Sequence, residues 1–193
     1  MKALCVFAGS SAGADPVYLD AARTLGHALA TRGLVVVYGG AKVGLMGAMA
    51  DAALAGGGRV VGVIPEALVA KEIAHAGLTA LHVVDSMHTR KAMMAELSDA
   101  FVALPGGWGT LEELFEVLTW GQLGLHRKPC GLLNVDGYFD GLLRFLDDTV
   151  ARGFVRPEYL KMIAVDTTAD GLLDRLAIAQ PPAVTKWIER SET

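Results

Sequence analysis

ALPGGWGTLEELFEVL, residues 103–118, joins an apolar run of strand length to a second apolar run with helical spacing. Three glycines, Gly106, Gly107 and Gly109, lie between the two runs. Glycine lets a ligand approach the backbone closely, and the first turn of a helix leaves N–H groups without partners inside the helix. The stretch therefore predicts a strand, an anion-binding loop and a helix, in that order.

The same alternation of strand and helix continues along the chain. Helical patterns separate apolar runs that are continuous, as is typical of parallel strands buried on both faces. We therefore expect an α/β, Rossmann-like, three-layer fold with a mostly parallel sheet and helices on both faces. The predicted strands begin near residues 3, 34, 59, 81, 100, 129 and 162, and the predicted helices are 16–32, 45–56, 88–98, 110–124, 138–152 and 168–179.

The length and composition favour one globular domain. The chain has 193 residues, of which 52% are hydrophobic, and we expect a single domain at 1–180 followed by a C-terminal tail at 181–193. The net charge is −4 and the basic residues are scattered, which argues against nucleic acid or a membrane surface as a partner. The first apolar run is too short for a signal peptide or a membrane span, so we expect a cytoplasmic protein. Cys5 and Cys130 lie in apolar segments, which indicates core thiols in a reducing compartment.

The glycine-rich loops do not match the two best-known phosphate-binding motifs. Residues 39–46, GGAKVGLM, carry Leu45 and Met46 where a P-loop has Lys and Ser or Thr, and no GxGxxG is present. A P-loop NTPase and an ordinary NAD-dependent dehydrogenase are therefore disfavoured. Several glycine- and serine-rich turns at one edge of a sheet still suit a nucleotide or a sugar phosphate. Ser10 and Ser11 could donate to such a ligand, or they could simply be turn residues.

Thr110 and Glu113 allow two interpretations. T-x-x-E is the pattern of a capping box, in which Thr110 caps the helix and Glu113 bonds back to the Thr110 N–H group. A capping box does not explain the three glycines before it. In the second interpretation a phosphate lies at Thr110, and Glu113 lies about 5 Å further along the ligand, near a ribose.

Arg90 and Lys91 are expected in the first turn of another helix, where cations oppose the helix dipole unless an anion is nearby. They could hold that anion, or they could be a solvated basic pair.

The histidines show no ligand spacing, so we expect no metal site. The helix at 111–123 is apolar nearly all round, which favours a homodimer unless an additional layer covers it. Trp108 could line a pocket or wedge the loop.

Taken together, these motifs resemble the Lonely Guy (LOG) family, the cytokinin riboside 5′-monophosphate phosphoribohydrolases. The family signature PGGxGTxxE is intact at residues 105–113. Matching stretches include CVFAGSSAG, YGGAKVGLMG, KEIAHAGLT, SMHTRKAMM and LTWGQLGLHRKPCGLLNVDGYFDGLL, which cover nearly the whole chain outside the tail. Ala8 replaces the usual Cys, and Ala41 replaces a third Gly.

The resemblance implies hydrolysis of the N-glycosidic bond of N6-substituted adenosine 5′-monophosphates to free base and ribose 5-phosphate, with no cofactor. It implies Arg90 and Glu113 as the catalytic pair. The implied nucleotide contacts are Glu72, Arg90, Lys91, Gly107, Trp108, Gly109, Thr110, Leu111, Glu112, Glu113 and Thr119.

An oxocarbenium-like transition state calls for a carboxylate near the anomeric carbon, which Glu113 can supply. The residues leave two alternatives open, a non-catalytic nucleotide carrier or sensor and a plain AMP nucleosidase. Lysine decarboxylation would need a pyridoxal phosphate lysine, and Lys42, Lys71 and Lys91 show no such context. The preferred N6 substituent also remains open.

Overall fold

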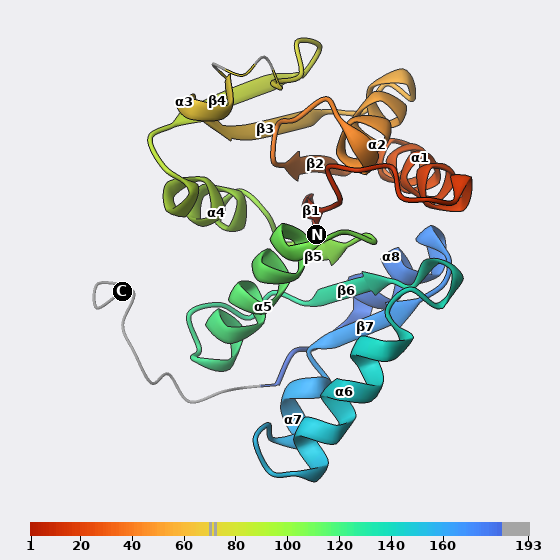
Figure 1. Cartoon of the computed structure of the whole chain (residues 1–193), viewed down its shortest axis with the longest axis vertical. Coiled ribbons are helices and arrows are strands. Elements are labelled where there is room, and N and C mark those ends of the chain that lie inside the picture. Colours follow the sequence, from red (N-terminus) through yellow and green to blue (C-terminus); the bar gives the residue numbers. More distant parts are fainter. Residues whose placement is uncertain (70, 72, 183–193) are drawn as a thin grey trace.

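All seven apolar runs predicted as strands form strands of a single sheet. The protein is described by a computed structural model, which describes residues 1–69, 71 and 73–182 (Figure 1). The strands are β1 (Ala3–Phe7), β2 (Val35–Tyr38), β3 (Val60–Pro65), β4 (Ala80–Val84), β5 (Ala100–Ala103), β6 (Cys130–Leu133) and β7 (Ile163–Asp166).

The sheet is parallel throughout and has the order β4-β3-β2-β1-β5-β6-β7. In the central strand β1, Cys5 pairs with Val37 of β2 on one side and with Phe101 of β5 on the other. Every residue of β5 and β6 is buried, as continuous apolar runs predict. Cys5 and Cys130 are free, buried thiols, which confirms their predicted place in the core.

Helices cover both faces of the sheet, which confirms the three-layer prediction (Figure 1). One core cluster packs α1, α2 and α8 against one face, and a second packs α4 and α5 against the other. The helices are α1 (Pro16–Thr31), α2 (Gly44–Ala55), α3 (Glu66–Val69), α4 (Met87–Glu96), α5 (Trp108–Gln122), α6 (Asp140–Ala151), α7 (Pro157–Leu160) and α8 (Ala169–Ile178), with a 3-10 turn η1 (Val135–Gly137).

Three of these elements were not predicted. The helices α3 and α7 have four residues each and η1 has three, and such short segments show no hydrophobic period that could indicate them. No helix within the described ranges is long and apolar enough to cross a membrane. Of the predicted tail, residues 181 and 182 carry no helix or strand, and 183–193 lie outside the described residues.

The direction in which strands are added reverses between β1 and β5. The strands β1 to β4 are added toward one edge of the sheet, and β5 to β7 toward the other. In open α/β sheets such a reversal opens a crevice at the carboxyl ends of the strands, where ligands bind. Here the crevice lies between the loop after β1 and the loop after β5. The Gly9 N–H donates a hydrogen bond of 3.2 Å to the Pro105 carbonyl, which links the two loops.

Candidate functional site

The loop after β5 leads directly into α5, and the helix begins earlier than the sequence indicated. Gly107 is the N-cap, no side chain caps it, and Trp108 is the first helical residue. The capping-box interpretation is therefore wrong. Thr110 is the third residue of the helix and is 4% exposed, with its side chain packed against the backbone of Gly106.

The three glycines of this loop have different reasons to be glycine. A Cβ atom on Gly106 would lie 2.1 Å from the Thr110 hydroxyl oxygen, so close packing requires glycine there. A Cβ atom on Gly107 or Gly109 would meet nothing within 4 Å, and neither residue has a positive φ. Nothing among the described residues requires glycine at these two positions. Their free space lies beside the first N–H groups of α5, where an approaching anion would need it.

A buried ion pair joins α4 to α5, because Arg90 lies on α4 and Glu113 lies on α5. Nη2 of Arg90 is 3.3 Å from Oε1 of Glu113, and each side chain is only 9% exposed. Arg90 also lies against Gly39, where a Cβ atom would be 1.9 Å from its guanidinium nitrogen. The interpretation of Arg90 and Lys91 as a solvated pair is therefore wrong, because both residues are 8% exposed.

The surroundings of Glu113 shift its proton affinity. Burial raises the pKa of Glu113 to about 7, and the charge of Arg90 opposes this rise. Glu112 raises the same pKa further, whereas Lys91 lowers it. A carboxyl group with a pKa near neutrality in a buried pair is typical of acid–base and electrostatic catalysis.

Lys91 is occupied by two other carboxylates. Its Nζ lies 2.5 Å from Oε1 of Glu112 and 3.0 Å from Oε1 of Glu116. Burial lowers the pKa of Lys91, but the hydrogen bonds that Lys91 donates to these two glutamates outweigh that effect, and the pKa is raised. Lys91 thus ties α4 to α5 and sets Arg90, its neighbour on α4, opposite Glu113.

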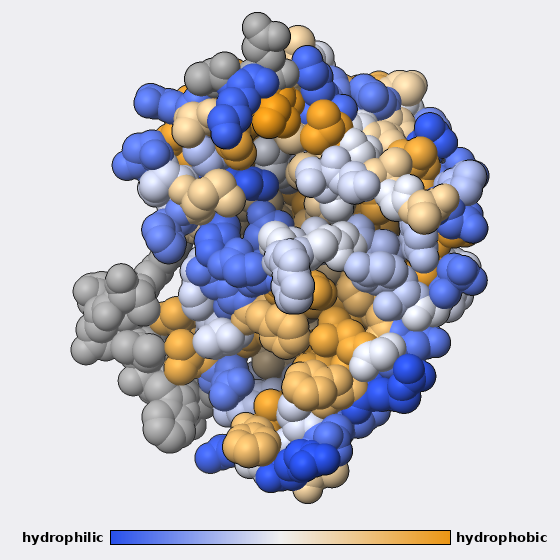
Figure 2. All heavy atoms as spheres, viewed as in Figure 1, coloured by the Kyte–Doolittle hydropathy of each residue, from blue (hydrophilic) through white to orange (hydrophobic). Residues whose placement is uncertain are grey.

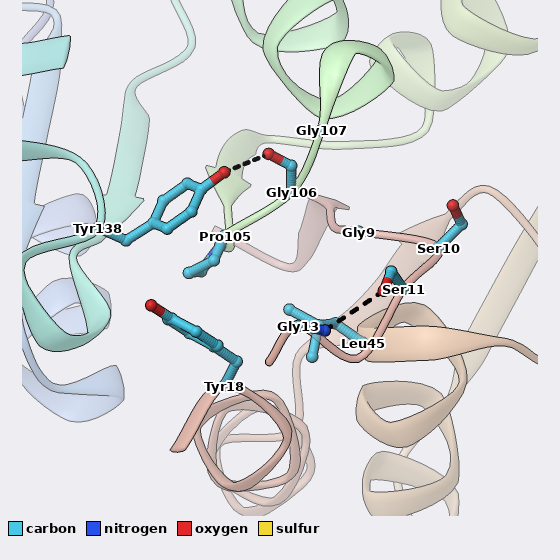
Figure 3. Close-up of a pocket in the computed structure, with 10 residues that line it drawn as sticks. All are labelled: Gly9, Ser10, Ser11, Gly13, Tyr18, Leu45, Pro105, Gly106, Gly107 and Tyr138. Carbon is cyan, nitrogen blue, oxygen red and sulfur yellow. Dashed lines mark hydrogen bonds between the residues drawn. The ribbon is translucent and has the colours of Figure 1, made fainter. Parts of the chain in front are cut away.

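A pocket of about 260 Å³ opens at the crevice between β1 and β5 (Figure 3). The rings of Tyr18 and Tyr138 lie next to each other on one side of it and pack edge to face, with their centroids 5.9 Å apart at an angle of 78°. The Tyr138 hydroxyl donates a 2.6 Å hydrogen bond to the Gly106 carbonyl. The lining residues are Gly9, Ser10, Ser11, Gly13, Tyr18, Leu45, Pro105, Gly106, Gly107 and Tyr138.

Ser10 and Ser11 line this edge, as the glycine- and serine-rich turns predict, whereas no motif of the sequence indicates either tyrosine. The available signal for Tyr138 was its position directly after an Asp-Gly turn that follows a buried strand. No comparable signal marks Tyr18, which lies within the first two turns of α1.

The remaining predicted site residues are spread over different surroundings. Trp108 is 90% exposed, so among the described residues it neither lines the pocket nor wedges the loop. Leu111 packs partly against the second core cluster. Thr119 is exposed, and its hydroxyl donates to the Phe115 carbonyl at 2.7 Å. Glu72 lies outside the described residues. Within the described ranges no cluster of three or more His, Cys, Asp or Glu side chains could hold a metal.

Comparison with known proteins places this site in a family. Residues 46–176 match the family described as possible lysine decarboxylase. A probable cytokinin riboside 5′-monophosphate phosphoribohydrolase of Oryza sativa subsp. japonica is 51% identical over 175 residues, which are 91% of this chain and 83% of the relative. The chain belongs to the LOG family. A LOG phosphoribohydrolase of Arabidopsis thaliana is 50% identical over 180 residues, which are 93% of this chain and 83% of that relative.

More distant solved structures share the fold of this LOG protein. The molybdenum cofactor binding protein of Rippkaea orientalis superimposes with a TM-score of 0.69 at 22% identity, over 92% of this chain and 96% of its own. The molybdenum cofactor carrier protein of Chlamydomonas reinhardtii gives a TM-score of 0.67 at 21% identity, over 91% and 96% of the two chains. At such identities the likeness shows the common architecture alone.

Proposed function

We propose that this LOG protein hydrolyses the N-glycosidic bond of N6-substituted adenosine 5′-monophosphates, which releases the free base and ribose 5-phosphate. The observation that carries the proposal is the buried pair of Arg90 and Glu113, one helical turn beyond a glycine loop with free space at Gly107 and Gly109. Relatives about half identical to this chain carry this activity in their names. No cofactor or metal is needed for the reaction we propose.

The 5′-phosphate binds at the N-terminus of α5. There the first N–H groups of the helix lack partners within the helix, and the helix dipole favours a negative charge. The open Cβ positions of Gly107 and Gly109 support this placement because they allow the phosphate to reach the backbone. Glu113 lies four residues after Gly109, about 6 Å along the helix axis, which suits the distance from a phosphate to a ribose.

The ionised carboxylate of Glu113 acts on the anomeric carbon. It stabilises the oxocarbenium-like transition state or activates the attacking water. The water oxygen bonds to C1′, the C1′–N9 bond breaks with its electron pair left on N9, and one water proton ends on the departing base. The 3.3 Å contact supports a role for Arg90 in keeping Glu113 ionised and oriented.

The alternative of a nucleotide carrier or sensor fits the site less well. A protein that only binds a phosphate gains nothing from a buried carboxylate beside an anionic ligand. A plain AMP nucleosidase would use the same residues, because the scissile bond and the phosphate are the same. The two enzymatic functions therefore differ only in the N6 substituent that the protein accepts.

The deciding experiment incubates the purified protein with N6-isopentenyladenosine monophosphate and, separately, with AMP, and measures the released base by liquid chromatography. The proposed function predicts faster release from the N6-substituted nucleotide, and the Glu113→Gln variant serves as the matched inactive control. Faster release from AMP would identify an AMP nucleosidase. Binding of both nucleotides without release of base would identify a carrier or sensor.

We also propose that the protein is a homodimer that buries the outer face of α5. Phe115 is 38% exposed on this helix, and Figure 2 shows apolar side chains on the face where α5 and α6 lie. Thr119, a nucleotide contact implied by the family resemblance, lies six residues after Glu113 and so about 240° around the helix axis. One ligand cannot easily touch both residues of the same helix. A dimer resolves this conflict because Thr119 can then reach the site of the partner copy.

Light scattering at micromolar protein concentration tests the assembly. The expected mass is twice the 20.3 kDa of the chain. Phe115→Glu places an unpaired charge in the proposed interface and should shift the protein toward monomer, whereas the same change at the exposed Phe154 should leave the mass unchanged. An active wild-type monomer contradicts the proposal.

We still expect the protein to be cytoplasmic, because Cys5 and Cys130 are free thiols in its core.

A further inference from the structure

The turn between β6 and α6 has an unusual backbone. Asp136 has φ 49° and ψ 35°, and it is the only non-glycine residue with a positive φ in the described part of the chain. Gly137 follows with φ 69°. The side chain of Asn134 holds this turn from both ends, because its Oδ1 accepts from the Phe139 N–H at 2.8 Å and its Nδ2 donates to Asp140 at 2.7 Å. A left-handed aspartate costs free energy and persists only where the surroundings enforce it.

The strained turn presents Tyr138 to the pocket (Figure 3). The ring is flanked edge-on by Phe139 at 5.0 Å and by Tyr18 at 5.9 Å. The residue is nevertheless 42% exposed, so burial in the core does not account for its placement. Its hydroxyl reaches across to the loop after β5 and donates to the Gly106 carbonyl at 2.6 Å, a contact between residues 32 positions apart.

That hydrogen bond acts on the peptide group shared by Gly106 and Gly107. A peptide unit is planar and trans, so the N–H group of Gly107 points away from the Gly106 carbonyl oxygen. When Tyr138 holds the oxygen, it also sets the direction of the Gly107 N–H. Glycine residues rotate freely about their own bonds, so this direction would otherwise be poorly defined.

The rest of Gly106 is held from two further directions. Its ideal Cβ position lies 2.1 Å from the Thr110 hydroxyl oxygen and 2.9 Å from the Gly9 nitrogen. Because these atoms lie so close, the α carbon of Gly106 has little room to move, and the Tyr138 hydroxyl holds the carbonyl. A Cβ atom on Gly107, in contrast, would meet nothing within 4 Å, although the Gly107 carbonyl accepts from the Leu111 N–H at 3.1 Å. The close packing around Gly106 therefore ends at the Gly106–Gly107 peptide group, where α5 begins.

We propose that Tyr138 is a positioning residue for phosphate recognition. Its hydroxyl aligns the Gly106–Gly107 peptide group so that the loop's N–H groups are already aimed at the 5′-phosphate before the nucleotide binds. Such alignment strengthens binding because it reduces the cost of ordering the loop when the ligand arrives. This inference rests on the proposed function in placing a phosphate at the start of α5, but it does not require that the protein hydrolyse the nucleotide.

The test compares binding in a hydrolysis-deficient background. Glu113→Gln and the double variant Glu113→Gln/Tyr138→Phe are titrated calorimetrically with AMP and with adenosine. The Phe substitution removes only the hydroxyl, and the melting temperature of each variant is measured to check that the fold is retained. Tyr159→Phe, which removes the same atom from a half-buried tyrosine of α7, is the matched control.

The expected result is a loss of AMP affinity of about 5- to 10-fold with Tyr138→Phe, as for one lost hydrogen bond, with adenosine affinity unchanged. Tyr159→Phe should change neither affinity. An equal loss for AMP and adenosine, or no loss for either, overturns the proposal, since a structural role does not distinguish the phosphate. If the wild type releases no base, the proposed function fails, but an AMP-specific loss still upholds the role of Tyr138.

Discussion

Arg90 of α4 and Glu113 of α5 meet in a buried ion pair, 3.3 Å apart, although 22 residues of sequence and the strand β5 separate them. Burying two charges is costly, and a buried pair adds little net stability compared with apolar residues of the same size. The pair is therefore better explained by function than by folding. It lies next to the glycine loop, and burial raises the pKa of its carboxyl group to about 7.

Replacing Glu113 with Gln tests this interpretation. The side chain keeps its shape but loses its charge, so transition-state stabilisation is lost, and we expect kcat to fall by a factor on the order of 10² or more. The melting temperature should fall, because Arg90 is left buried without its counterion, but the variant should still fold. The measurements are base release and thermal unfolding. Near-normal turnover with a large loss of stability would return Glu113 to a structural role.

The pH dependence follows from the raised pKa of the same carboxyl group. If the ionised form acts, kcat/KM rises with pH while Glu113 loses its proton near pH 7 and is constant above that. The charge of Arg90 lowers this pKa, so Arg90→Gln should move the rising limb to higher pH as well as reduce the rate. The Glu113→Gln variant should show no rising limb in its pH profile. This result distinguishes titration of Glu113 from titration of the substrate phosphate. A limb at the same pH in wild type and Arg90→Gln contradicts the assignment.

The sequence predicted the layers of this fold far better than the geometry of its site. Buried parallel strands leave long apolar runs, so all seven strands were found. The capping-box interpretation placed the N-cap of α5 at Thr110, three residues after the actual N-cap Gly107, because a T-x-x-E sequence does not reveal whether its threonine packs against a glycine instead. The hydrogen bond from Tyr138 to Gly106 joins two loops through one side chain and one carbonyl group, and no local pattern encodes such a contact.

Gly109 and Gly141 form a matched pair, since each is the second residue of its helix and each has space for a Cβ atom. Alanine at either position should stabilise the helix by up to about 1 kcal/mol. Only Gly109→Ala should lower kcat/KM for the nucleotide, because the added methyl group occupies space that we assign to the phosphate. Turnover and thermal unfolding of both variants decide the matter. Equal turnover of the two variants would argue against a ligand at Gly109.

Treatment with a chelator tests the absence of a metal from the proposed mechanism. The proposed chemistry needs only Glu113, Arg90 and water, so exhaustive treatment with EDTA should leave the rate of base release unchanged. The control is the same protein passed through the same desalting column without EDTA. A loss of turnover that Mg²⁺ or Zn²⁺ restores would show that the mechanism is wrong.

The 5′-phosphate should act as a remote anchor for the nucleotide. The scissile C1′–N9 bond of the nucleotide is far from the phosphate. The energy with which the loop binds the phosphate nevertheless holds C1′ against Glu113 and the attacking water. A phosphate held by several backbone donors and a helix dipole contributes ~4 kcal/mol to binding, so the free riboside should have a kcat/KM lower by a factor on the order of 10³.

Gly107 provides the matching substitution, because a Cβ atom there would meet nothing within 4 Å and a valine side chain would enter the space that we assign to the phosphate. Gly107→Val should greatly reduce turnover of the monophosphate and have little effect on the slow turnover of the riboside. The measurement is base released from matched monophosphate and riboside by the wild type and by the variant. Equal wild-type rates on the two substrates would mean that the glycines of this loop do not serve to bind a phosphate.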